Sequence, residues 1–397
     1  MFTRRVKVPV APKAAVVVAV AVTRALVVVL LCVCLPSRAG VLPDDRADAL
    51  YHSYDGGDVE ITGPSVLILK KIGQNVALSG NYYVDSISSA SIDVVTSGAS
   101  KYSEDRTELS AGVDYMHGNS IMSLSYTNSD EDDYEGNTAS FGVKMDMFGN
   151  MTTVSLGYAY GWDTVKNNTD STFSEDIDRQ NYRLGLSQVL SKDLVMELDL
   201  ETITDEGFLN NPYRSVRYLD PGSALGYSFQ SEVYPSTRTS NAAAIRSIYY
   251  LPYRASVSAE YRFFDDTWDI TAHNIKLAYV HTLPGGWLLE GRYRYYTQTA
   301  ADFYSDLFPF RDAQNFLARD KELSKFHSNT FGATVSYDFI ENGSKYIDRG
   351  SINLSYDHIM FDYDDFRDIR NTAVTAGTEP LYDFTSDVVQ VFLSIWF

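Results

Sequence analysis

The chain has 397 residues, of which 52 are acidic and 33 are basic, so its formal net charge is −19. Nucleic-acid partners require basic stripes on a protein surface, and this balance argues against them. Both cysteines, Cys32 and Cys34, lie within residues 1–39, together with six basic residues and no acidic one. The remaining chain has 27 basic and 52 acidic residues, which gives a net charge of −25. Because it has no cysteine, it cannot form a disulfide or a thiolate metal site.

The first 39 residues have the organisation of a secretory signal peptide. A basic start without acids is followed by residues 14–35, which are apolar except for two positions, and then by small residues up to Ala39. We expect cleavage between Ala39 and Gly40. The alternative is a retained transmembrane anchor, since about 20 apolar residues can span a bilayer. Arg24 and the small-residue site favour cleavage.

After the signal peptide the amphipathic period is two residues, which predicts strands. In residues 331–339, for example, Phe331, Val335 and Phe339 share one wholly apolar face, and the residues between them form a polar or small face. The same division recurs in residues 109–115, 122–126, 139–145, 154–162, 182–186, 194–201, 257–263, 287–295, 351–356 and 387–397.

Three features favour a transmembrane antiparallel all-β barrel over a soluble sandwich. Aromatic residues are frequent near the ends of the apolar faces. The opposite faces are small, polar or alternately charged, as in Glu260 with Arg262 and in Glu290 with Arg292 and Arg294. The connections alternate between short turns and the longer segments 87–105, 163–178, 204–238, 298–325 and 361–384, which predicts short periplasmic turns and long external loops.

The turns divide the chain into fifteen clear strands, of which the first is 65–72. A periplasmic N-terminus requires one more strand before it, and the only candidate is 58–62, followed by a turn at Gly63 and Pro64. We therefore expect about 16 strands, with 14 as the alternative. Residues 40–57 would then be an N-terminal periplasmic segment, and residues 58–397 the outer-membrane barrel.

The last strand predicts where the barrel is assembled. Leu393, Ile395 and Phe397 lie on its apolar face, and with Trp396 they resemble the signal that the outer-membrane assembly machinery reads. We expect Phe397 to lie against lipid at the periplasmic interface of a bacterial outer membrane, with lipid and lipopolysaccharide around the barrel.

Several loop segments are dense in Tyr, Phe, Arg and Asp. Together with "LPDDRADALYHSYDGG" at 42–57, the phrases at 210–223, 297–309, 315–324 and 361–368 resemble an uncharacterised bacterial outer-membrane family, the domain-of-unknown-function family 3570. The resemblance covers essentially the whole mature chain. It implies a barrel without an established activity and offers no catalytic residues.

Candidate chemistry is sparse, and we expect neither an enzyme nor a cofactor. The acidic run "DEDDYE" at 130–135 would suit Ca²⁺ or Mg²⁺, but a solvated loop tip is the simpler interpretation. A hydrolase within the barrel is a third hypothesis, without a Ser, His and acid motif to support it. None of the histidines has the spacing of a metal site, which holds for His52, His117, His273, His281, His327 and His358.

The leading hypothesis is a porin-like channel for small solutes, because about 16 strands leave room for an aqueous pore. We predict that segments 204–238 and 298–325 fold inward and partly constrict it. The alternative is a structural or partner-binding sleeve for another exported protein. Arg292 and Arg294 would form either a selectivity band or an ion-paired wall. The predicted pore-lining residues, whose acidic members should favour cations, are Glu197, Asp199, Glu201, Glu260, Arg262, Glu290, Arg292 and Arg294.

Overall fold

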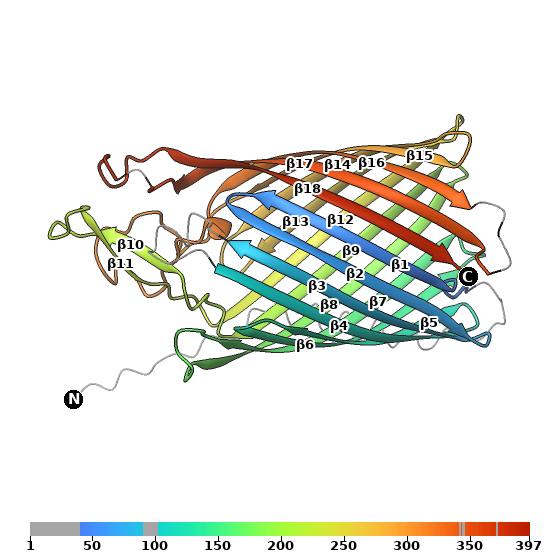
Figure 1. The fold of residues 1–397 in the computed structure, drawn as a ribbon, viewed down its shortest axis with the longest axis horizontal. Helices are drawn as coiled ribbons and strands as arrows, with labels where there is room; N and C mark the ends of the chain where they lie inside the picture. Colours follow the sequence, from blue (N-terminus) through green and yellow to red (C-terminus); the bar gives the residue numbers. More distant parts are fainter. Residues whose placement is uncertain (1–39, 90–101, 341–342, 344–345, 371) are drawn as a thin grey trace. The chain divides into compact units, whose positions relative to one another are not determined.

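Sixteen antiparallel strands close into one barrel in the computed structural model, which describes residues 40–89, 102–340, 343, 346–370 and 372–397 (Figure 1). This confirms the fold and the count of 16 strands. The signal peptide and its cleavage site lie outside the described residues. Within the described part of the chain, no helix is long and apolar enough to span a membrane.

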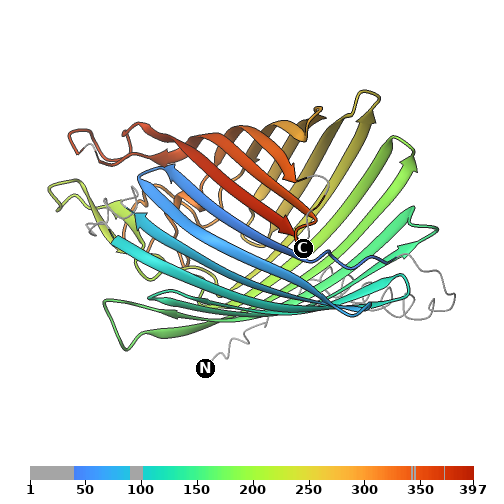
Figure 2. The ribbon, with the colours of Figure 1, turned by 45° about the vertical axis from the view of Figure 1, so that its right-hand side comes forward.

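The strands follow one another around the barrel in chain order. β9 pairs with β12, because β10 and β11 form a separate two-stranded sheet, and β18 pairs with β1 to close the ring (Figure 2). The first nine strands are β1 (Arg46–Gly56), β2 (Val59–Ile72), β3 (Val76–Ser89), β4 (Tyr102–His117), β5 (Ser120–Asp130), β6 (Tyr134–Met147), β7 (Thr152–Lys166), β8 (Ser174–Ser191) and β9 (Leu194–Gly207). The others are β10 (Ser215–Leu219), β11 (Tyr227–Ser231), β12 (Thr237–Leu251), β13 (Ala255–Asp266), β14 (Thr271–Thr282), β15 (Trp287–Gln298), β16 (Phe326–Ile340), β17 (Arg349–Arg367) and β18 (Leu381–Trp396), with one short 3-10 helix, η1 (Lys321–Leu323).

The alternation of each strand sorts its side chains between the two faces of the closed sheet. On β9, Leu198 and Leu200 are each 41% exposed although they are apolar. Exposed apolar side chains of this kind recur on every barrel strand from β1 to β18, and they form the outer, lipid-facing surface expected of a membrane barrel. The residues of opposite parity form the inner face, which we call the lumen wall.

The prediction for the first strand was wrong. The strand preceding residue 59 is β1, which lies within the segment assigned to the periplasm, and β2 runs through Gly63 and Pro64 without turning. A Cβ on Gly63 would lie 1.7 Å from the carbonyl oxygen of Val84, so glycine serves close strand approach here. In the register of β2 with β3, residues 63 and 64 have no partner. The missing N–H of Pro64 therefore interrupts the hydrogen bonds between these two strands, while β2 itself continues.

The strict alternation of short and long connections was also only partly right. All the predicted short turns lie at the end of the barrel where β18 finishes, which we call the short-turn end. At the opposite end, the loop end, residues 57–58, 131–133 and 267–270 are short connections as well. Gly57 and Asp58 both have positive φ, 61° and 62°, which gives a two-residue hairpin turn that sequence composition alone does not distinguish from a loop.

Candidate functional site

Three connections at the loop end pack on one another, and we call residues 208–236, 299–325 and 368–380 the loop layer. Two of them are joined by backbone hydrogen bonds. The N–H of Val233 donates to the carbonyl of Leu317 at 2.9 Å, and the N–H of Leu317 donates back at 2.7 Å. Phe308 and Leu219 make a similar link, since the N–H of Leu219 donates to the carbonyl of Phe308 at 2.9 Å. The segments 204–238 and 298–325 therefore pack on one another, whereas the constriction of the lumen that we expect from them stays a prediction.

An aromatic core joins two segments of the loop layer to the short connection 267–270. The rings of Tyr234, Trp268 and Phe303 are mutual neighbours, with centroids 5.2 to 5.6 Å apart. All three side chains are buried, and Leu323 of η1 joins the same cluster. Burial raises the pKa of the Tyr234 hydroxyl, and so does the nearby carboxylate of Glu232, to which that hydroxyl donates at 2.6 Å. The loop layer is thus held by apolar burial as well as by backbone pairing.

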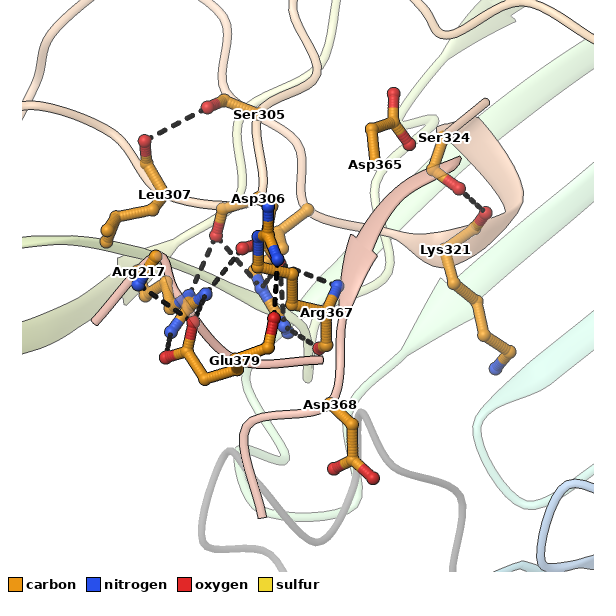
Figure 3. Close-up of polar contacts among 12 residues, drawn as sticks. Arg217, Ser305, Asp306, Leu307, Lys321, Ser324, Asp365, Arg367, Asp368 and Glu379 are labelled. Carbon is orange, nitrogen blue, oxygen red and sulfur yellow. Dashed lines mark hydrogen bonds and ion pairs between the residues drawn. The ribbon is translucent and has the colours of Figure 1, made fainter. Parts of the chain in front are cut away.

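A buried ionic network centred on Asp306 ties the loop layer together (Figure 3). The Asp306 carboxylate forms ion pairs with Arg217 and with Arg319, whose Nη2 lies 3.0 Å from Oδ1. It also accepts a hydrogen bond from the backbone N–H of Arg367, at 3.2 Å. The backbone carbonyl of Asp306 accepts from Nε of Arg217 at 2.9 Å and from Nε of Arg319 at 3.1 Å. One aspartate therefore connects two arginines of different loops and the end of β17.

Glu379 adds the third loop to this network. Its carboxylate accepts from Nη1 and Nη2 of Arg217, at 2.5 and 3.1 Å, in the two-pronged geometry of a guanidinium and a carboxylate. Arg217 is fully buried and Glu379 is 3% exposed. Burial alone would raise the pKa of Glu379, but the hydrogen bonds from Arg217 and from backbone N–H groups hold it below the ordinary value. An unpaired charge here would be costly, so the network is stable only when complete.

A cavity of about 1010 Å³ lies between the loop layer and the lumen wall. The loop layer forms its roof, and ten strands contribute residues to its floor and sides, namely β3, β4, β6, β7, β8, β9, β12, β13, β14 and β15. The residues from the wall include Arg179, Asp205, Arg238, Arg262, Phe264, Tyr296 and Gln298, and those from the loop layer include Phe208, Tyr213, Arg214, Tyr234, Asp320 and Leu323.

The acidic run at 130–135 is not simply a solvated loop tip. Glu131, Asp132 and Asp133 line the cavity together with Glu104 of β4. One carboxylate oxygen each from Glu104, Glu131 and Asp133 lies within 4.8 Å of the others. Burial raises the pKa of Glu131, and Asp133 and Asp85 add to the shift, while Arg106 opposes it. The sequence motif missed Glu104, which comes from a different strand.

The three acids predicted on β9 share the lumen wall, but two of them are paired. Glu201 lies 2.9 Å from Nε of Arg183 on β8 and 3.3 Å from Nη2 of Arg262 on β13. Glu197 lies 3.6 Å from Nη1 of Arg246 on β12. Only Asp199 has no ion pair among the residues that the structure describes. The cation preference expected from these acids is therefore reduced by arginines on the neighbouring strands.

The remaining predicted lumen residues also face inward, and two arginines of one strand differ sharply. Arg292 donates to both Asp357 oxygens, at 2.7 and 2.5 Å, and to the hydroxyls of Thr334 and Ser355, both at 2.7 Å. Glu290 lies 3.6 Å from Nη1 of Arg292. Arg294, by contrast, is exposed to the lumen and donates to the side chain of Asn274 at 3.1 Å. Arg292 is therefore part of an ion-paired wall, whereas Arg294 is available to solutes.

The histidines divide between the two faces of the barrel. Five of them lie on the outer face. In four of these five, the centroid of the histidine ring lies 6.0 to 6.5 Å from the centroid of a tyrosine ring; these are His117, His273, His281 and His327. Nδ1 of His358 instead lies 2.8 Å from Oδ1 of Asp387, within hydrogen-bond distance. His52 faces inward, with Nε2 2.6 Å from Asp85. The Tyr83 hydroxyl lies 3.3 Å from the same Nε2, and no serine hydroxyl is bonded to His52 in the described part of the chain.

The C-terminal residues occupy two different environments. Phe397 is 41% exposed on the outer side, where Lys70 lies 4.8 Å from its ring centroid. Leu393 and Ile395 share the outer face, whereas Trp396 has the opposite parity and packs against Arg349, at 4.8 Å from its ring centroid. The end of β18 thus presents Leu393, Ile395 and Phe397 on the outer face, whereas Trp396 points inward.

The sequence profile of the family described as "Protein of unknown function (DUF3570)" matches residues 94–349, which is more than half of the chain. The chain belongs to this family. The match confirms the resemblance found in the loop phrases and brings no assigned activity with it. No curated protein matches the chain.

Similar solved structures are distant barrels. A bacterial polysaccharide outer membrane secretin is 6% identical, with a TM-score of 0.47, over 90% of this chain and 100% of that one. The CymD monoaromatic hydrocarbon channel is 7% identical, with a TM-score of 0.43, over 90% and 89%. A Pseudomonas aeruginosa FadL homologue is 8% identical, with a TM-score of 0.41, over 89% and 91%.

Proposed function

We propose that this DUF3570 protein is a bacterial outer-membrane channel for small solutes whose loop layer constricts the lumen at the external end. The observation that supports it most is the cavity of about 1010 Å³, which lies between the lumen wall and the loop layer and is lined by charged and aromatic side chains. A pocket of this size and composition suits a small organic solute.

Placement in the envelope belongs to the same proposal. The short-turn end would face the periplasm, and the apolar outer surface would contact lipid and lipopolysaccharide after insertion by the assembly machinery. The signal peptide at residues 1–39 would direct export.

The alternative, a sleeve for an exported protein, needs free space where the partner enters. In the structure, the chain's own segments 208–236 and 299–325 roof the cavity. This arrangement favours small solutes over a polypeptide, because a folded or extended protein would first have to displace the buried network around Asp306.

Conductance in planar bilayers tests the channel directly. We expect discrete channel openings from the purified barrel, and larger or more frequent openings from Asp306→Asn, because the variant weakens the ion pairs that hold the loop layer closed. Arg311→Gln is the control: Arg311 lies in the same layer, is 69% exposed and forms only a surface pair with Asp312.

A correctly folded barrel that is silent both as wild type and as Asp306→Asn would contradict the channel and support the sleeve. Folding is checked by the heat-modifiable migration of barrels in gels.

A further inference from the structure

Two cations face each other directly on the lumen wall. Lys276 of β14 and Arg294 of β15 are partners in the strand register, and both are exposed on the inner face. Neither has a carboxylate within ion-pair distance among the residues that the structure describes. Like charges placed directly opposite each other on one face of a sheet are destabilising. A contribution to the stability of the lumen wall therefore does not explain why Lys276 and Arg294 lie opposite each other.

The neighbours of the pair do not neutralise it. Lys276 is flanked on its other side by Glu260, whose own next partner is Arg246. Arg246 is engaged by Glu197 at 3.6 Å. The row across β12, β13, β14 and β15 therefore contains three cations and one carboxylate, and its positive end is the side where Lys276 and Arg294 meet.

Aromatic rings lead from the cavity to this positive end. The guanidinium of Arg294 lies 5.4 Å from the ring centroid of Tyr296, and Tyr296 lines the cavity. Higher on the same wall, Arg262 lies 5.9 Å from the ring centroid of Phe264, and that ring also lines the cavity. An apolar group that enters the cavity would thus remain in contact with rings until it reaches the cations.

The opposite side of the cavity has the opposite charge. Glu104 lies on β4, which is the eighth strand from β14 in a ring of 16 and therefore diametrically across the barrel. Glu131, Asp132 and Asp133 lie next to Glu104. These carboxylates repel solutes with several negative charges, and they favour an orientation in which a single anionic group points toward β14 and β15.

We propose that Lys276 and Arg294 bind the carboxylate of a small organic anion, with its apolar part against Tyr296. A guanidinium and an ammonium supply several charge-assisted donors to one carboxylate, and the ring supplies an apolar contact. The route of entry rests on the proposed channel function, whereas the binding site itself does not.

Isothermal titration of the purified full-length barrel in detergent, with benzoate as the probe, tests the site. We expect benzoate to bind, and the double variant Lys276→Gln, Arg294→Gln to bind it roughly ten- to hundredfold more weakly, as the loss of hydrogen bonds to charged groups implies. Lys144→Gln is the matched control, because Lys144 is another exposed lysine on the lumen wall, near the short-turn end of β6. Its affinity should equal that of the wild type.

Two further probes define the ligand class: one is uncharged and organic, and the other is an inorganic anion. Benzyl alcohol should not bind measurably, because it lacks the charge, and inorganic phosphate should bind more weakly than benzoate, because it lacks the ring. Equal binding of benzoate by the wild type and the double variant would overturn the site, and phosphate binding as tight as that of benzoate would overturn the organic class. If the double variant fails to fold, the single variants are titrated separately, and an unchanged affinity in both likewise overturns the site.

The result is independent of conductance. Benzoate binding by a barrel that never conducts would leave this site in place and end the channel proposal, whereas conduction without benzoate binding would do the reverse.

Discussion

A single missing side chain decides the position of Arg292. Gly332 of β16 lies between Arg292 on β15 and Asp357 on β17 in the strand register. A Cβ on Gly332 would lie 2.0 Å from Asp357 Oδ1 and 2.5 Å from Arg292 Nε. The arginine can therefore cross a whole strand and reach the aspartate only because residue 332 is glycine.

Gly332→Ala should break this bridge. The new methyl group displaces both charged groups, and we expect the free energy of unfolding to fall by about 1–3 kcal/mol, the usual effect of leaving hydrogen-bonded polar groups unsatisfied. Reversible urea unfolding in lipid vesicles measures it. Gly291→Ala is the control, since Gly291 lies on the adjacent strand with no atom within 4 Å of its would-be Cβ. Equal stability of both variants and the wild type would contradict the role of Gly332.

The difference between Arg292 and Arg294 was beyond the sequence. Their spacing of two predicts correctly that both face the lumen, because strand alternation is local. Whether each finds a carboxylate depends on the register of β15 with β16 and β17, and Asp357 is 65 residues away from Arg292. The sequence therefore left a selectivity band and an ion-paired wall equally open, and the structure assigns Arg292 to the wall.

At the scale of elements, the loop layer was predictable in kind and not in detail. The density of aromatic residues in segments 204–238 and 298–325 indicated correctly that they pack. The ion pair between Arg217 and Glu379 joins residues 162 positions apart, and no local pattern identifies such partners. The cavity was likewise not predictable, because its lining residues come from ten strands and several loops.

The loop layer should open in acid. Because the pKa of Glu379 in the folded loops lies below its ordinary value of 4.5, the stabilisation from its ion pair is present above that value and is lost as the pH falls through the lower, folded pKa. We expect pepsin to cleave within residues 208–236 or 368–380 only at pH values below about 4, while the barrel strands resist. Glu379→Gln should be cleaved to a similar extent at higher pH, because it carries no charge to lose.

Glu322→Gln provides the comparison for this experiment, since Glu322 is an exposed acid of the same loop layer. It should keep the acid transition of the wild type. An unchanged transition in Glu379→Gln would show that another group controls the opening.

At the scale of the whole molecule, β18 closes the barrel, because it pairs with β17 on one side and with the first strand, β1, on the other. The sequence predicted the number of strands, the direction of the last one and its outward apolar face, because these follow from alternation and turn chemistry. It misplaced the first strand, since β1 carries Leu50 and Tyr54 on one face and Tyr51 on the other, so no clean alternation marks it and only its pairing with β18 reveals it.

Replacing Phe397 with Asp should prevent assembly. The outward aromatic group is lost and a charge is placed at the lipid boundary, so we expect the heat-modifiable barrel to disappear from the outer-membrane fraction and the chain to be degraded. Phe148→Asp is the control, because Phe148 is 77% exposed in a turn at the same end, and aspartate tolerates its positive φ of 52°. Normal outer-membrane levels of Phe397→Asp would contradict the assembly role.

The network around Asp306 also constrains the order in which the molecule can fold. Glu379 lies two residues before the start of β18, so Arg217 remains without its glutamate until nearly the whole chain is in place. Contacts between residues this far apart in sequence form late, because the long intervening segment must first be ordered. We therefore expect the roof over the cavity to be completed late in folding, after the residues between β17 and β18 are in place.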